Sequence, residues 1–225
     1  MELIVFSDLH GYFDNLNDLK NKSNLFFLGD ICTNKNFVNI IGIDFMNFYK
    51  GKINAEELNF KFQKIKDKLN NTQMNFPLPN FFIENNIFVL PGNHETQDYY
   101  EKLTNLENIF NLHLKKIKLE NLEIIGHGGM ISPHDEIQNA NFFIYSDKKV
   151  SQNLEKLNAS TNCVILMHEL PIAPYCIETR KVIERIKPKL VIGGHNHRIA
   201  NQEFEINGIK YLATSMKGNY SKYEL

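Results

Sequence analysis

Five short apolar runs are each followed by a cluster of side chains that can bind metal ions or move protons. The runs are Leu3–Phe6, Leu25–Leu28, Ile87–Leu90, Val164–Met167 and Leu190–Ile192; the clusters are Asp8-Leu9-His10-Gly11, Gly29-Asp30, Gly92-Asn93-His94-Glu95, His168-Glu169 and Gly193-Gly194-His195-Asn196-His197. In open α/β sheets, ligands bind at the carboxyl ends of the strands. Five strands that point the same way would therefore bring the five clusters together.

The clusters supply oxygen and nitrogen ligands and no cysteine, which argues against a closed structural zinc site. The candidate metal ligands are Asp8, His10, Asp30, Asn93, His168, His195 and His197. Seven ligands exceed what one ion requires and suit two divalent ions that share a carboxylate, held roughly 3.5–4 Å apart. Water bound at such a site ionises near neutral pH, so no Ser or Cys nucleophile is needed. We expect two ions per chain, with Mn first and Fe, Zn, Co or Ni as alternatives.

Taken singly, these residues also have ordinary structural interpretations. Asp8 could cap a helix, Asp30 and Asn93 could sit in turns, and His168 could be a buried structural histidine. Their occurrence together, each after an apolar run, favours a shared site over independent coincidences.

The elements that must position these residues follow from periodicity. Apolar runs rich in Ile, Val, Leu and Phe indicate strands that are buried on both faces. Helical spacing joins Leu58, Phe62, Ile65 and Leu69, then Val150, Leu154 and Leu157, then Val182, Ile183 and Ile186, with Pro188 ending the last helix. Hairpins are predicted for Lys116–Leu119 with Leu122–Ile125, and for Glu203–Ile206 with Ile209–Leu212 around Asn207-Gly208. Strands alternating with helices favour an α/β layered fold.

The segment at about 36–80 differs from the rest because its pattern is helical and contains no clear strand. We interpret residues 1–225 as a single domain that carries this helical insertion, although a long crossover connection fits the pattern equally well. Its aromatic residues are Phe37, Phe45, Phe48, Tyr49, Phe60, Phe62 and Phe76. They could pack the insertion onto the core or a partner chain, or form a wall that stacks a base beside the metals.

Composition bounds the function further. The chain has 225 residues, with 25 Lys and Arg against 26 Asp and Glu and a formal net charge of −1. This balance does not imply a broad electrostatic grip on nucleic acid. No run approaches the ~18 apolar residues of a membrane span, and Leu3–Phe6 is too short for a secretory signal. The odd cysteine count, Cys32, Cys163 and Cys176, favours a reducing compartment, so we expect a cytoplasmic protein that does not bind membranes.

The ordered motifs Asp-x-His, Gly-Asp, Gly-Asn-His-Glu, a lone strand-end His and Gly-His-x-His resemble the calcineurin-like metallophosphoesterases over Asp8 to His197. The resemblance implies two mixed β-sheets packed face to face with helices outside, a four-layer sandwich. It also implies that Asp8, His10 and His197 hold one metal, that Asn93, His168 and His195 hold the second, and that Asp30 bridges them. His94 would bind no metal and would stabilise the phosphoryl transition state or protonate the leaving oxygen.

Some residues near these motifs allow more than one role. His127, in Gly126-His127-Gly128-Gly129, resembles the metal-binding His of the protein-phosphatase branch, but His168 fits better because it ends an apolar run and has Pro171 close behind. We expect His127 near the site rim. Glu95 and Glu169 are expected to be loop or cap carboxylates, or else to orient neighbouring histidines.

The motifs also depart from one branch of the family. The protein phosphatases continue Gly-Asp into an Asp-Arg pair whose Arg grips phosphate, whereas Gly29-Asp30 continues into Ile31-Cys32-Thr33-Asn34 and contains neither partner. We therefore predict a hydrolase acting on a phosphate ester, with a small-molecule or nucleotide phosphodiester as the leading substrate class. The alternatives are a nuclease of the same fold, a phosphomonoesterase or protein phosphatase, and a non-catalytic scaffold. Nucleic acid is not the favoured partner, and the sequence leaves the oligomeric state open.

Overall fold

Three of the five apolar runs form neighbouring strands of a first sheet. The computed structural model describes residues 1–31, 43–48, 50–135, 137 and 139–225. The first sheet has the order β13-β1-β2-β3-β4, made of β1 (Glu2–Phe6), β2 (Leu25–Phe27), β3 (Ile87–Val89), β4 (Ile109–Asn111) and β13 (Ser221–Glu224). Strands β1 to β4 are parallel and β13 is antiparallel to β1. The ends of β1, β2 and β3 therefore lie along one edge.

The other two runs belong to a second sheet. Its order is β11-β12-β10-β9-β6-β5, made of β5 (Lys115–Leu119), β6 (Leu122–His127), β9 (Cys163–Glu169), β10 (Leu190–Gly194), β11 (Glu203–Ile206) and β12 (Ile209–Ala213). The inner strands β6, β9, β10 and β12 run parallel, and the outer strands β5 and β11 are antiparallel arms of hairpins. Two short parallel strands, β7 (Met130–Ser132) and β8 (Ile144–Ser146), pair apart from both sheets.

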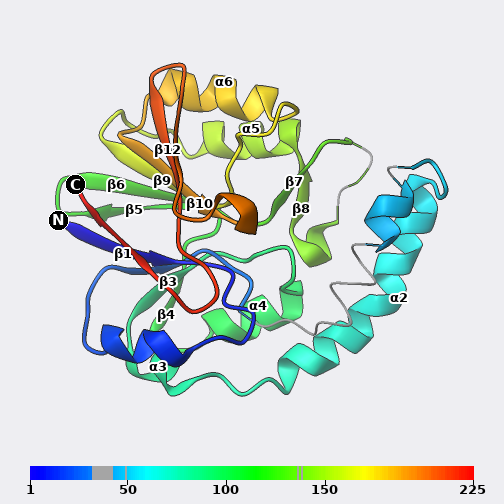
Figure 1. Cartoon of the computed structure of the whole chain (residues 1–225), viewed down its shortest axis with the longest axis horizontal. Coiled ribbons are helices and arrows are strands. Elements are labelled where there is room, and N and C mark those ends of the chain that lie inside the picture. Colours follow the sequence, from blue (N-terminus) through cyan, green and yellow to red (C-terminus); the bar gives the residue numbers. More distant parts are fainter. Residues whose placement is uncertain (32–42, 49, 136, 138) are drawn as a thin grey trace.

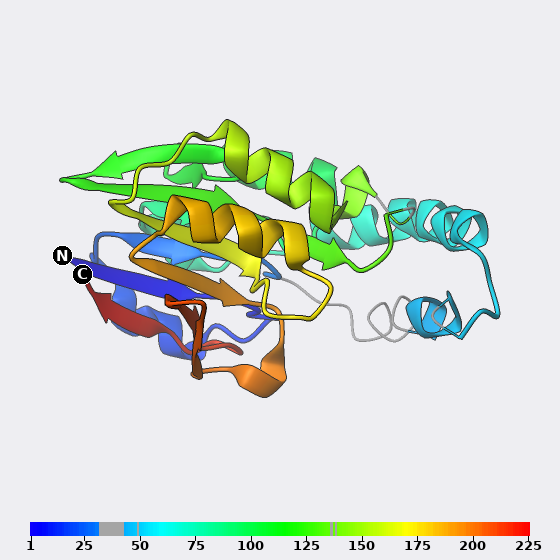
Figure 2. The same cartoon turned by 90° about the horizontal axis from the view of Figure 1, so that it is seen from above.

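The two sheets pack face to face through a continuous apolar layer. From the first sheet it takes Leu3, Val5, Phe26, Leu28 and Leu90, and from the second Ile124, Val164, Leu166, Ile192 and Leu212. These side chains alternate with others that point outward, as the period of a strand requires. Figures 1 and 2 show the sheets between two helical layers. The layer order of helices, sheet, sheet and helices confirms the predicted fold class.

The helices cover the outer faces of the sheets. On the first sheet lie η1 (Asp14–Leu19), α3 (Asn80–Glu84) and α4 (Gln97–Thr104); on the second lie α5 (Asp147–Lys156) and α6 (Ile177–Ile186). The short 3₁₀ turns η2 (Ala140–Phe142) and η3 (His197–Ile199) lie in connections. Helices α4 and α5 are capped at their N-termini by Thr96 and Ser146, whose side chains accept hydrogen bonds from backbone N–H groups.

The described part of the predicted insertion is mainly helical. Residues 43–48 are helical, and α2 (Ala55–Met74) begins with a capping box between Asn54 and Glu57. The aromatic pairs are Phe45 with Phe62, Phe62 with Phe142, Phe48 with His134, and Phe76 with Phe13. Phe60 is 60% exposed and lies under the Lys64 ammonium. These described rings thus pack within the chain or face solvent, while Phe37, Tyr49 and the start of the segment at 36–42 lie outside the described residues.

The predicted strands and hairpins are present in the structure, which also contains strands that were not predicted from the sequence. All five apolar runs and both hairpins are present. Strands β4 and β13 were not predicted, because β4 contains only two apolar residues, Ile109 and Phe110, and β13 has the polar sequence Ser-Lys-Tyr-Glu at a sheet edge. Within the described residues, no helix combines the length and apolar character needed to cross a bilayer.

The apolar layer between the sheets should dominate stability. Leu166 on β9 is fully buried in it. Leu166→Ala removes buried methyl groups and leaves a cavity, so we expect the free energy of unfolding to fall by about 2–5 kcal/mol. Chemical denaturation measures this. As a control, Leu106→Ala at an exposed position should change it by about 0.5 kcal/mol or less. Equal effects of the two substitutions would contradict the packing of the sheets.

Candidate metal centre

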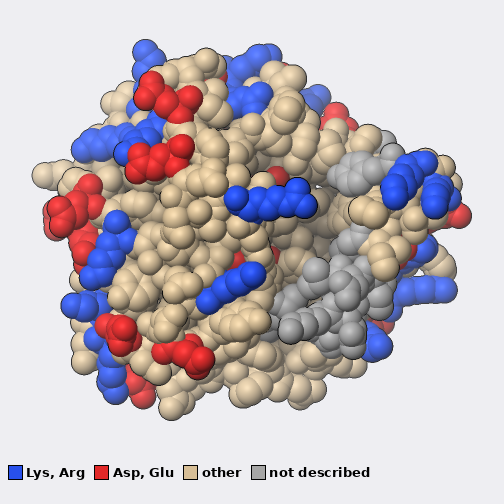
Figure 3. Space-filling model, in the orientation of Figure 1, with Lys and Arg blue, Asp and Glu red and all other residues tan. Residues whose placement is uncertain are grey.

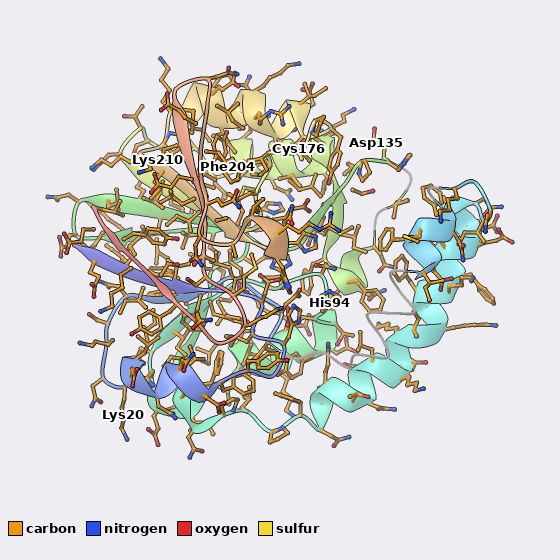
Figure 4. The ribbon with its side chains drawn as sticks, in the orientation of Figure 1. Lys20, His94, Asp135, Cys176, Phe204 and Lys210 are labelled. Carbon is orange, nitrogen blue, oxygen red and sulfur yellow. The ribbon has the colours of Figure 1, made fainter. Side chains whose placement is uncertain are left out.

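The strand ends of both sheets bring the predicted ligands together. Two groups have donor atoms that lie within 4.8 Å of one another: Asp8, Asp30, His168 and His195 in one, and Asp8, His10 and His197 in the other. Asp8 belongs to both groups, whereas the resemblance implied that Asp30 would bridge. His94 lies in the same region, in the middle of the molecule between the strand ends and α2 (Figure 4).

Each carboxylate has one oxygen bound by the chain and one turned toward imidazoles. Asp8 Oδ2 accepts the Ser7 hydroxyl at 2.5 Å and the His195 N–H at 2.8 Å. Asp8 Oδ1 lies 3.3 Å from Nε2 of His197 and 3.8 Å from Nε2 of His10. In the same way, Asp30 Oδ1 accepts the backbone N–H of His94 at 3.0 Å, while Oδ2 faces ring nitrogens.

The tautomer of His168 is fixed by a backbone carbonyl. Its Nδ1 lies 2.7 Å from the Leu28 oxygen, which can only accept, so Nδ1 carries the hydrogen. Burial is the main reason that the pKa of His168 falls to about 4, so the ring is neutral near pH 7. Its Nε2 therefore presents a lone pair, 3.0 Å from Oδ1 of Asn93 and 3.6 Å from Oδ2 of Asp30. Three atoms with lone pairs, from His168, Asn93 and Asp30, therefore lie close together, and such atoms are the ligands that a cation requires.

A second convergence involves His10 and His197, whose Nε2 atoms are 3.2 Å apart. Burial is the largest cause that lowers the pKa of His10 to about 4, which keeps its ring neutral. Two imidazole nitrogens and Asp8 Oδ1 thus point at one place. Nitrogen ligands combined with a carboxylate suit a divalent transition metal. The residues of both groups therefore fit such an ion.

Buried negative charge strengthens this fit. Asp8, Asp30 and Glu95 are each about 1% exposed, and none forms an ion pair with Lys or Arg within the described residues. The pKa of Asp30 is raised well above its usual value by burial and by the charges of Glu95 and Asp8. Burial also acts to raise the pKa of Asp8, but the hydrogen bond with His197 and the charges of His168 and His195 lower this pKa overall. Bound cations would offset this charge.

The backbone is strained at the positions of these side chains. Asp8, His10, Asp30 and His195 all have φ between +48° and +67°, the left-handed region that L residues avoid. Each such residue costs of order 1 kcal/mol or more and persists only where the surroundings determine it. Backbone hydrogen bonds from the N–H of Asp8 to Gly29 and from the N–H of His10 to Asp30 hold the first two loops in register.

Glycine is required where the loops touch. A Cβ on Gly92 would lie 1.9 Å from Oδ1 of Asp30, and one on Gly194 would lie 2.1 Å from the Ser7 hydroxyl oxygen. Either side chain would displace a carboxylate or its partner. The glycines of the Gly-Asn-His-Glu and Gly-His-x-His motifs therefore admit the neighbouring loop.

Glu95 clamps two loops that carry candidate ligands. Its carboxylate accepts the N–H groups of Asp30 at 2.8 Å, Ile31 at 2.7 Å and Gly92 at 2.5 Å. Burial raises its pKa to about 7, against the lowering effect of these hydrogen bonds. Glu95 was predicted as a loop or cap carboxylate, or else as one that orients neighbouring histidines. Its role depends on a contact across 65 positions, which no local pattern reveals.

The insertion reaches the site through a second residue that the sequence did not indicate. Gln73 on α2 is buried; its amide donates to the His94 carbonyl, and its Oε1 accepts the Thr96 N–H at 2.9 Å. His94 Nε2 lies 3.6 Å from Asp30 Oδ2, and its ring is 5.7 Å from that of His10. The pKa of His94 falls to about 3, mainly through burial, so its ring is neutral.

His127 lies apart from the two groups. Its Nε2 is 3.2 Å from the Asn153 amide nitrogen, and its ring contacts His113 and Tyr145. It is buried rather than at a rim. Glu169 is also buried and accepts the Ile131 N–H at 2.7 Å, as expected of a structural carboxylate. His168 is therefore the histidine that the fold brings to the donor set.

The sandwich fold and the grouped Asp and His side chains define a metal-binding hydrolase. A sequence profile of the calcineurin-like phosphoesterases matches residues 1–198. The chain therefore belongs to the calcineurin-like phosphoesterase family, whose members hydrolyse phosphoester bonds, and the resemblance found in its motifs is confirmed.

Solved structures support the fold. One crystal structure is 18% identical in sequence with a TM-score of 0.69, covering 98% of this chain and 93% of its own. The protein TT1561 of Thermus thermophilus is 12% identical with a TM-score of 0.59, covering 99% of this chain and 97% of its own. Among curated proteins, no sequence matches this chain.

The Glu95 clamp can be tested with one isosteric change. Glu95→Gln places an amide NH₂ against at least one backbone N–H, so we expect the free energy of unfolding to fall by about 1–3 kcal/mol. Because the clamp orients ligand-bearing loops, metal affinity should weaken roughly 10- to 100-fold. Denaturation and metal titration measure the two effects. Glu107→Gln, at an exposed position, is the matched control; an Mn²⁺ affinity for Glu95→Gln equal to that of Glu107→Gln would rule out the clamp.

Proposed function

We propose that this phosphoesterase hydrolyses a small-molecule or nucleotide phosphodiester at a centre of two divalent ions. The observation that supports this most is the pair of donor groups that share Asp8 at the meeting point of both sheets. In the proposal, Asp8, His10 and His197 hold one ion, Asn93, His168 and His195 hold the other, and Asp30 bridges them. When bound, such ions activate water as a nucleophile and neutralise charge on the phosphoryl group.

The chain's own residues set the geometry of that reaction. The neutral rings of His10 and His168 keep lone pairs directed inward, and the hydrogen bonds of Asp8 and Asp30 leave one oxygen of each carboxylate facing them. The low pKa of His94 favours a neutral N–H that donates a hydrogen bond to a phosphoryl or leaving oxygen, over a protonated acid at pH 7.

Charge at the surface supports a small anionic substrate. A hollow opens near the middle of one face, with basic side chains beside it (Figure 3). Lys217 donates its backbone N–H to the Asp8 carbonyl at 3.1 Å, and Arg198 follows directly after the proposed ligand His197. The sequence after Asp30, Ile31-Cys32-Thr33-Asn34, contains neither residue of the Asp-Arg pair of the protein phosphatases, which supports a substrate other than a phosphoprotein.

Two further features belong to the proposal. Mn is the metal we propose, since imidazole with carboxylate ligands accepts it and availability decides among similar ions. Cys163 and Cys176 are free and buried, which supports a reducing, cytoplasmic location; Cys32 lies outside the described residues.

The function is tested by metal add-back. Stripped protein is reconstituted with Mn²⁺, Fe²⁺, Zn²⁺, Co²⁺ or Ni²⁺ and assayed on model monoesters, diesters and an oligonucleotide. We expect about two ions per chain by elemental analysis, diester hydrolysis, and loss of activity with a chelator. Trace metal only after reconstitution would exclude the two-ion centre, and cleavage confined to the oligonucleotide would make the chain a nuclease.

Two buried histidines separate the proposed ligand from its alternative. His168 and His127 are 0% and 1% exposed, so replacement by Ala creates comparable cavities. His168→Ala should bind one ion per chain, because it removes a donor of the second group, while His127→Ala should still bind two. Elemental analysis after dialysis reads out the difference. The opposite pattern would move the centre to His127.

His94 should act on turnover rather than on metal content. His94→Ala removes a hydrogen-bond donor that touches substrate in the proposal, so we expect kcat to fall roughly 10²–10⁴-fold with two ions retained. Steady-state kinetics on a diester and elemental analysis of the same sample are the measurements. Loss of an ion from this variant would instead make His94 a ligand.

A further inference from the structure

A pocket of about 620 Å³ adjoins the candidate metal centre. One wall is the connection between β9 and α6, and the other is the turn that follows β10. His195 and His197, which belong to different donor groups, both line it. A substrate whose phosphate lies at those groups would therefore place part of its organic moiety in this pocket. We call it the Tyr175 pocket, after the aromatic residue in its wall.

The β9–α6 wall is held in one conformation. It contains Pro171 and Pro174, which restrict the backbone. The Arg180 guanidinium donates to the carbonyls of Pro171 at 3.3 Å, Ala173 at 2.5 Å and Pro174 at 3.4 Å. The wall ends at Cys176, which is buried where α6 begins (Figure 4). A braced wall of this kind belongs to a preformed pocket, because little ordering is left for a ligand to induce.

Tyr175 is anchored at its polar end. Its hydroxyl donates to Oε1 of Glu169 at 3.2 Å, and the other oxygen of Glu169 accepts the Ile131 N–H. The carboxylate is thus fixed from two sides, and the side chain of Tyr175 remains 36% exposed. Tyrosine supplies a large, rigid contact area at low entropic cost, so an anchored ring suits a planar ligand.

The lining is mixed in a way that selects the ligand class. Leu170, Ile172 and Ile199 supply apolar surface, while Asn196 and Arg198 supply polar groups at the turn. An acyl chain would cover those polar groups without hydrogen bonds, which is unfavourable. A nucleobase has apolar faces and a polar edge, and stacks on aromatic side chains. The volume also falls in the range of sites for small organic molecules.

We propose that the Tyr175 pocket binds the nucleobase of a nucleotide ester whose phosphate lies at the metal centre. The inference rests on the proposed function and deepens it by naming the substrate class. It assigns base recognition to the β9–α6 connection and the turn after β10, on the second sheet. The helical insertion, at least in its described residues, contributes nothing to the pocket lining.

Two diesters with the same leaving group test the pocket. Thymidine 5′-(p-nitrophenyl phosphate) carries a base, and methyl p-nitrophenyl phosphate does not, while both release p-nitrophenolate. With the Mn²⁺-loaded enzyme we expect kcat/KM to be about 5- to 150-fold higher for the thymidine ester, the range that stacking of one base provides. Tyr175→Ala should bring this ratio close to one, and Tyr175→Phe, which keeps the ring, should retain most of it.

Further variants guard against a folding defect and against a general loss of aromatic surface. Ile172→Trp fills the pocket without removing Tyr175 and should also reduce the ratio. Phe110→Ala removes a 41% exposed ring from β4, on the edge of the other sheet, and should leave the ratio unchanged. A wild-type ratio near one, or a ratio that survives both Tyr175→Ala and Ile172→Trp, would overturn the inference.

The inference and the proposed function fail in distinguishable ways. Hydrolysis of both diesters without preference would refute the base pocket and leave the phosphoesterase intact. If neither diester is hydrolysed, the proposed function fails, and calorimetric titration of the Mn²⁺-loaded protein with thymidine 5′-monophosphate then tests the pocket alone. Binding that is lost in Tyr175→Ala supports the pocket, and absence of binding refutes it.

Discussion

Two hydrogen bonds between the sheets govern the rest of the structure. Asp8, after the first sheet's β1, accepts the backbone N–H of His195 at the end of β10, and His168 on β9 donates to the carbonyl of Leu28, just after β2. Each bond joins a proposed ligand to the opposite sheet. The geometry of the centre therefore depends on how the two sheets pack across the apolar layer. A shift between the sheets would separate the two donor groups and also leave buried polar groups unpaired, which is costly.

The centre concentrates features that oppose folding. Left-handed backbone at Asp8, His10, Asp30 and His195, together with the buried carboxylates of Asp30 and Glu95, disfavours the folded state of the chain alone. The apolar layer between the sheets supplies the compensating stability, and bound cations would add to it, because ligands that bind only the folded state stabilise it. The hydrogen bonds of Glu95 then hold the strained loops in place.

Much of this could be predicted from sequence because it is local. An apolar run that ends in Gly-Asp or Gly-His-x-His predicts a strand and, at its end, the candidate ligands. The five strands and the proposed ligands were therefore predicted together. The division of those strands between two sheets came from family resemblance, since run composition does not record which strands pair. Glu95, Gln73 and the sharing of Asp8 could not be predicted, because each depends on contacts between distant segments. Strand β13 was not predicted because, as an edge strand, it lacks the apolar run that marks a buried strand.

The sequence left two roles open for the aromatic residues of the insertion, packing or stacking a base, and the described contacts favour packing. Its described rings are largely taken up by packing, with Phe62 between Phe45 and Phe142, and α2 reaches the centre through the polar contact of Gln73 with the His94 loop. The insertion thus acts on the position of His94. In our proposal, substrate selectivity depends instead on the connection that Arg180 braces, beside His195 and His197. In that proposal, changes in the Tyr175 pocket would alter substrate choice without moving His94, because the pocket and the Gln73 contact belong to different elements.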